Sequence, residues 1–159
     1  MAYKCILAPV KGEGIDQDVL TLASHLARPG KGQVVIIYVI EVPRHQPVDA
    51  DLPQEAARGE EVLRQAERWV QEHRVQAAAL LLQARDAGPA VVKEAVEQKA
   101  DLVVVGLPYK QVHGAFTLGR AIPYILQHAP CPVLLLREAV PSEEPSSPPP
   151  PRITKVVGS

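Results

Sequence analysis

Cysteine is scarce in this sequence, and its placement excludes several kinds of site. The two cysteines, Cys5 and Cys131, each lie beside an apolar run. Neither has a second cysteine or a histidine nearby at metal-ligand spacing. We therefore expect buried free thiols in a reducing compartment, and neither a disulfide framework nor a zinc site.

The sequence also lacks an excess of charge and a long apolar run. Its 17 basic and 18 acidic residues give a net charge of -1, so no positive surplus marks a nucleic-acid-binding protein. No apolar run approaches the roughly 18 to 20 residues of a membrane span. The first residues also lack the charged and apolar regions of an export signal. We expect a cytoplasmic protein without direct membrane insertion.

Signals of catalysis and metal binding are missing as well. No Gly-x-Ser-x-Gly nucleophile turn occurs in the sequence, so a Ser/His/Asp arrangement has no starting point. The histidines are scattered without ligand spacing, which predicts helix-face or surface positions and no metal site. They are His25, His45, His73, His113 and His128.

What the sequence does contain is a regular alternation of apolar runs and helical patterns. Segments with helical periodicity lie between the runs, and Gly and Pro residues mark their ends. The run at 33–40 is apolar almost throughout, as in parallel strands covered on both faces. Five strands and four helices in alternation, joined by right-handed crossovers, predict a doubly wound, Rossmann-like, five-stranded parallel sheet with helices on both faces. We expect the strands at 5–10, 33–40, 77–82, 101–106 and 133–137.

Several details of the helices and loops are predicted by composition. A proline-interrupted loop should run from residue 42 to about 54, followed by a helix to about residue 74 with Trp69 in the core. The next helix should begin with Pro89 at its first position. Asp16 and its neighbours Glu13 and Asp18 should complement the amino end of the first helix. Asp49 and Asp51 in the loop either cover the mouth of a site or are solvated.

The end of the chain differs in composition from the rest. We place one domain at residues 1–138, a proline-rich linker at 139–152 and a short tail at 153–159. Four consecutive prolines in the linker favour an extended polyproline-like segment. The tail is either flexible or a strand that adds to a sheet edge of this or a partner chain.

The segment between the fourth strand and the last helix bears on function. An apolar run ends at Gly106, a polar stretch follows, and Gly119 precedes a helical pattern. In a parallel α/β protein this order places a loop at the carboxyl end of a strand next to a helix amino terminus, which favours anions. Tyr109 and Arg120 are large residues at two positions where small residues would suit phosphate binding.

Four stretches carry a resemblance to a known family. They read Ile-Leu-Ala-Pro-Val-Lys-Gly at 6–12, Val-Ile-Ile-Tyr-Val-Ile at 35–40, Asp-Leu-Val-Val-Val-Gly at 101–106 and Ala-Pro-Cys-Pro-Val-Leu-Leu-Leu-Arg at 129–137. Over residues 2–138 the chain resembles the universal stress protein family. The resemblance implies an adenine nucleotide alpha hydrolase-like fold and a role in the stress response. It also implies a homodimer joined through the last strand, from Val133 to Leu136.

Many members of this family bind ATP, and the resemblance implies where this chain would do so. Gly106 and Gly119 stand at the first and third glycine positions of the family's phosphate motif, and Tyr109 replaces the second. Arg120 replaces a serine or threonine, and Lys11 replaces an aspartate. The nucleotide-binding positions so implied are Pro9, Val10, Lys11, Val39, Gly106, Tyr109, Gly119, Arg120 and Ala121.

The replacements change the chemistry of these positions. A tyrosine keeps the backbone away from a phosphate and disfavours positive φ. Arg120 removes a hydroxyl donor, and Lys11 removes an acceptor for the ribose or the base edge. Lys11, Lys110 and Arg120 either form a rebuilt anion site or are solvated surface charges. Together the changes argue against ordinary ATP binding.

Three functions follow as hypotheses. The first is a non-catalytic regulatory or adaptor domain, linked to a transporter because residues 41–47 resemble that region in transporter-attached members of the family. The second is a nucleotide-binding protein that holds ATP, AMP or a cyclic dinucleotide through altered contacts. The third is a hydrolase or transferase using the same pocket.

Overall fold

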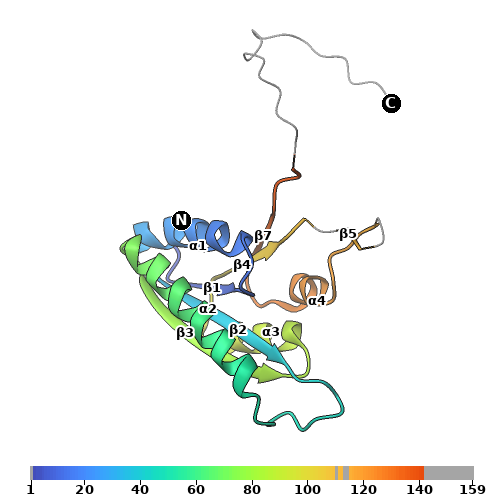
Figure 1. Cartoon of the computed structure of the whole chain (residues 1–159). Helices are drawn as coiled ribbons and strands as arrows, with labels where there is room; N and C mark the ends of the chain where they lie inside the picture. The colour runs from blue at the N-terminus through green and yellow to red at the C-terminus, as the bar shows by residue number, and fades with distance from the viewer. Residues whose placement is uncertain (1, 110, 113–114, 142–159) are drawn as a thin grey trace, which may run out of the picture.

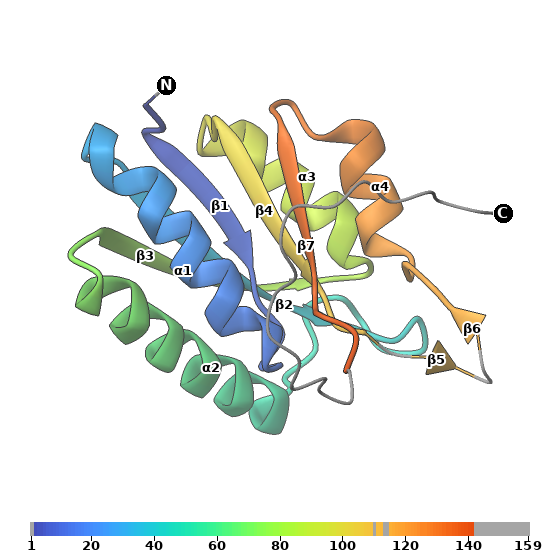
Figure 2. The same ribbon diagram turned by 90° about the horizontal axis from the view of Figure 1, so that it is seen from above.

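The computed structural model describes residues 2–109, 111–112 and 115–141 of the chain (Figure 1). A five-stranded parallel sheet lies at the centre, with the strands in the order β3-β2-β1-β4-β7. Figure 2 shows α1 and α2 on one face of this sheet and α3 and α4 on the other. The predicted doubly wound fold is confirmed.

The helices and strands alternate as the apolar pattern predicts. The sheet strands are β1 (Cys5–Pro9), β2 (Gln33–Glu41), β3 (Gln76–Ala84), β4 (Leu102–Leu107) and β7 (Val133–Arg137). The helices are α1 (Ile15–Ala27), the short 3-10 helix η1 (Arg28–Gly30), α2 (Pro53–Glu72), α3 (Ala87–Glu97) and α4 (Ala121–His128). Two short strands, β5 (Gln111–Val112) and β6 (Ala115–Phe116), form an antiparallel pair between β4 and α4.

The sheet separates two apolar clusters, one beneath each pair of helices. Ile6 of β1 is fully buried in the cluster on the α1–α2 side, and its neighbour Leu7 is fully buried in the cluster on the α3–α4 side. Successive side chains of a strand point to opposite faces, so an apolar run is needed to satisfy both clusters. Truncating either side chain to alanine should cost about 2–5 kcal/mol.

Some boundaries differ from the sequence expectations. Pro53 begins α2 instead of ending the loop, because proline fits the first turn of a helix, where its missing N–H is not needed. α3 begins at Ala87, so Pro89 is its third residue and not its first. Trp69 is partly buried and packs against the cluster on the α1–α2 side, and its indole N–H donates to Thr21 Oγ1 of α1 at 2.9 Å. The segment after β4, expected to be a loop, contains the β5–β6 pair.

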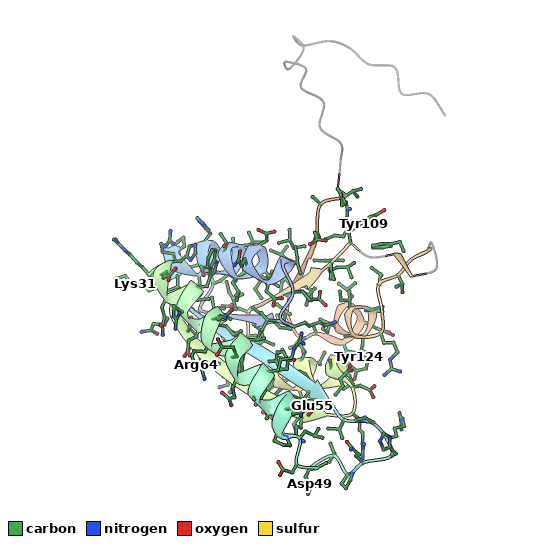
Figure 3. The ribbon with its side chains drawn as sticks, in the orientation of Figure 1. Lys31, Asp49, Glu55, Arg64, Tyr109 and Tyr124 are labelled. Carbon is green, nitrogen blue, oxygen red and sulfur yellow. The ribbon has the colours of Figure 1, made fainter. Side chains whose placement is uncertain are left out.

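The proline-rich loop that follows β2 is fixed to the end of β3. The Gln83 side-chain amide donates to the carbonyls of Val48 and Ala50, at 3.0 and 3.1 Å, and Arg85 donates to the carbonyl of Pro43 at 2.6 Å. Figure 3 shows Asp49 at the far end of this loop. Neither Asp49 nor Asp51 lines the cavity described below.

The proposed linker and tail fall almost entirely beyond the described part of the chain, since residues 142–159 lie outside it. The domain boundary at 138 therefore stays a prediction. Among the described residues, no helix is both long and apolar enough to cross a bilayer.

Candidate functional site

A cavity of about 330 Å³ opens at the carboxyl ends of β1 and β4. From β1 the chain runs to β2 on one side, whereas β4 and β7 lie on the other side of β1. The chain thus leaves β1 and β4 in opposite directions, and in open α/β sheets ligands bind at such a switch point. The walls are largely apolar and come from β1, the loop that follows it, α1, β2, β4, α3 and α4.

Six of the nine residues implied by the resemblance line this cavity, and three do not. The three that lie outside the lining are Tyr109, Gly119 and Arg120. The six that line it are Pro9, Val10, Lys11, Val39, Gly106 and Ala121. The structure therefore brings the positions in and after β1 and in β2 together with both ends of the phosphate motif, Gly106 and Ala121, whereas Tyr109, Gly119 and Arg120 lie outside the lining.

The loop that carries Lys11 is held by the carboxylate of Asp16. Backbone N–H groups of Lys11, Gly12 and Glu13 donate to Asp16 Oδ2 at 3.3, 2.7 and 3.0 Å. Burial raises the pKa of Asp16, and these three hydrogen bonds offset part of that rise. Asp16 thus organises the loop before α1, a more specific role than the dipole interaction expected from the sequence.

The two glycines that remain of the phosphate motif have structural explanations within the fold. A Cβ on Gly106 would lie 2.7 Å from Val19 Cγ2 and 3.2 Å from Ile15 Cγ1, so glycine allows α1 to pack against β4. Gly119 has a positive φ of 70° with no atom near a Cβ position, so it serves a turn. Its N–H donates to Thr117 Oγ1 at 3.1 Å.

Tyr109 is held beside the end of β7. Its backbone N–H donates to Glu138 Oε1 at 3.1 Å, and its ring lies 5.8 Å from the Arg137 guanidinium carbon. The Phe116 ring stacks against it with centroids 6.1 Å apart. Figure 3 shows Tyr109 well apart from Tyr124 on α4. Tyr109 is not among the residues that line the cavity, so its ring does not fill it.

Arg120 turns toward α3. Its Nη2 lies 2.6 Å from Asp86 Oδ1, which joins the N-cap residues of α4 and α3. The first backbone N–H of α3, from Ala87, donates instead to Glu41 Oε2 at 2.9 Å. Two carboxylates and one guanidinium therefore meet beside the cavity.

The sequence reasoning missed cavity residues on α1, β2 and β4 as well as on α3 and α4. Ile122, Ile125 and Glu41 belong to no motif that marks a binding site. No local signal could have found them, because the sequence does not show where the two helices cross the sheet. The principal additions are Glu41, Ala87, Val91, Ile122 and Ile125.

Metal binding finds no support in the described part of the chain. No three side chains of His, Cys, Asp or Glu are gathered there as a metal would require. His25 and His73 do approach each other, with ring centroids 6.1 Å apart, on α1 and at the end of α2. Lys110 and His113 lie outside the described residues.

The fold and the cavity together define a doubly wound domain of the adenine nucleotide alpha hydrolase-like type. The family model described as the Universal stress protein family matches residues 2–137. The chain belongs to this family.

Similar proteins support the same assignment. Universal stress protein MJ0531 of Methanocaldococcus jannaschii is 26% identical over 142 residues, which are 86% of this chain and 83% of that protein. A universal stress protein structure from Archaeoglobus fulgidus has a TM-score of 0.71 at 20% identity and covers 84% of this chain and 98% of that one. A structure from the same organism in complex with dAMP has a TM-score of 0.67 at 20% identity, with 85% and 98% covered.

Proposed function

We propose that this protein is a non-catalytic regulatory domain that binds an adenine nucleoside or nucleoside monophosphate in the cavity between β1 and β4. The observation that carries the proposal is an open cavity lined by Pro9, Val10 and Val39, from which the Tyr109 ring and the Arg120 side chain are both absent. A universal stress protein of similar fold was solved with dAMP, which supports this class of ligand.

The size of the cavity favours a small ligand. Its volume of about 330 Å³ lies near the lower end of the range of roughly 300–1,000 Å³ common for small-molecule pockets. A nucleoside suits this volume better than a cyclic dinucleotide. The apolar walls formed by Val39, Val91 and Ile122 suit the faces of a purine ring.

The charges around the cavity disfavour a triphosphate. Among the described residues, its lining carries the carboxylates Glu13, Asp16 and Glu41 but only one cation, Lys11. Arg120, which stands at the family's hydroxyl position, supplies no hydroxyl for phosphate or metal and is paired with Asp86. A ligand with few phosphate charges would meet less repulsion here.

The residue types of the 106–121 loop support the non-catalytic part of the proposal. The sequence offers no serine or cysteine nucleophile in the 106–121 loop, and general acid-base chemistry needs a group within reach of the reacting atom. We expect no ATP turnover above a heat-killed control. Turnover that disappears on Lys11→Ala would support the hydrolase alternative instead.

A second candidate is an adaptor that works through its protein surface. Leu134 and Leu135 of β7 are 41% and 39% exposed on an edge strand, and an open apolar edge favours pairing with another strand. A homodimer through β7 would cover them. The 41–47 segment, which resembles that of transporter-attached members, is a candidate surface for a protein partner.

Calorimetry on the full chain with adenosine, AMP and ATP tests the proposal. Adenosine and AMP should bind and ATP should bind more weakly. Ala121→Leu should abolish binding, because this partly buried first residue of α4 lines the cavity. Ala57→Leu, at an exposed position of α2, should bind like the parent. If none of the three ligands gives binding heat, the nucleoside-binding proposal is wrong and the adaptor function is the remaining candidate.

A further inference from the structure

The Asp86–Arg120 pair lies next to the proposed nucleoside cavity. A second hollow, between the amino ends of α3 and α4, is lined by Asp86, Arg120 and Tyr124. It shares Glu41, Ala87 and Ala121 with the nucleoside cavity, so the two are adjacent. A group that extends from the cavity past Ala121 would meet the Asp86–Arg120 pair.

The charge balance at this junction is negative. Asp86 lies 2.6 Å from Arg120 and neutralises it, while Glu41 accepts the first N–H of α3 at 2.9 Å. The guanidinium is therefore already bonded to a carboxylate, and a second carboxylate lies at the same junction. A phosphate entering here would meet more negative than positive charge.

We propose that Asp86 determines the phosphate preference of this site by pairing with Arg120, and so selects adenine ligands with no or few phosphates over ADP and ATP. The inference rests on the proposed nucleoside-binding function. It assigns a specificity role to two residues 34 positions apart, neither of which needs to contact the nucleoside.

Asp86 can be changed without loss of the fold. The Arg120 side chain is 84% exposed and that of Asp86 38% exposed, and exposed ion pairs contribute little to stability. Although Asp86 is the N-cap residue of α3, its side chain makes no capping hydrogen bond. Asp86→Asn should therefore fold normally while freeing Arg120 for an anion.

The experiment compares adenosine, AMP and ATP binding to the parent, Asp86→Asn and Glu61→Gln by calorimetry. Glu61 is the matched control, since it is an exposed carboxylate paired with Arg64 on α2. For Asp86→Asn we expect affinity to rise about three- to tenfold for AMP and more for ATP, with adenosine unchanged. Glu61→Gln should leave all three affinities unchanged. In the double variant Asp86→Asn/Arg120→Gln, the gain in AMP and ATP affinity should disappear.

A second probe separates this inference from the proposed function. Inorganic tripolyphosphate, followed by the NMR signal of the Arg120 side-chain N–H, tests the pair without any nucleoside. If tripolyphosphate shifts the Arg120 side-chain signal more in Asp86→Asn than in the parent, and no more in Glu61→Gln than in the parent, the inference is supported even if adenosine does not bind. Adenosine binding with no gain for AMP, ATP or tripolyphosphate in Asp86→Asn would overturn the inference and leave the proposed function standing.

Discussion

Gly106 and Val19 approach so closely that a methyl group on Gly106 would lie 2.7 Å from Val19 Cγ2. This contact joins β4 to α1 at the edge of the cavity. Retention of glycine at this motif position is therefore explained by helix–sheet packing, whether or not a phosphate binds.

Replacing Gly106 with alanine should destabilise the domain by about 1–3 kcal/mol, the cost of overpacking a well-packed core. Gly14→Ala is the control, because a Cβ there has no atom within 4 Å and its φ is -59°. Chemical denaturation measures both. Equal stability of the two variants would refute the packing explanation.

Lys11→Asp should tighten adenosine binding about three- to tenfold. The resemblance places an aspartate at this position, where it accepts hydrogen bonds from the adenosine side, and Lys11 lines the cavity. Lys31→Asp makes the same change of charge at an exposed position just after η1 and should have no effect. Weaker binding by Lys11→Asp would show that the lysine itself holds the ligand.

Leu134→Asp should convert a dimer into a monomer if β7 joins two copies. The substitution places a charge on an edge-strand side chain that is 41% exposed, where dimerisation would bury it at high cost. Leu126→Asp, at a similarly exposed position on α4, serves as the control. Sedimentation velocity at micromolar concentration should show a monomer only for Leu134→Asp. If the parent itself is a monomer, the predicted dimer is wrong.

The stability contribution of Asp16 should fall as pH rises. Folding raises the pKa of Asp16, first through burial, so the folded state binds a proton more readily than the unfolded state. The difference in unfolding free energy between the parent and Asp16→Asn should therefore decline from pH near 3.8 upward and become constant above the folded pKa. Denaturant titrations at several pH values measure it, with Asp18→Asn as control. A difference that grows with pH would mean that the three N–H bonds dominate.

Much of the fold could be predicted because its pattern is local. The continuous apolar run at 33–40 and the helical spacing of Ile15, Val19 and Leu22 depend on neighbouring residues alone. Right-handed crossovers then imply a parallel sheet with helices on both faces, whereas the strand order became known only from the structure. The β5–β6 pair was missed, since two-residue strands leave too little periodicity to detect.

The site was only partly predictable because its decisive contacts are distant in sequence. Sequence reasoning placed Pro9, Val39 and Ala121 at the cavity through the family resemblance, and they line it. Nothing local indicates that Arg120 turns to Asp86 or that Glu41 accepts the N–H of Ala87. Those contacts depend on where α3 and α4 begin relative to the sheet.

Methyl NMR of the full chain during titration with adenosine tests the central claim most directly. Methyl groups of Ile37, Val39 and Ile122 line the cavity, whereas those of Leu63 and Val70 lie in the α1–α2 cluster across the sheet. The account predicts saturable shifts for the first group, little change for the second, and the same pattern with AMP. Unchanged Ile37, Val39 and Ile122 signals at millimolar adenosine would contradict it.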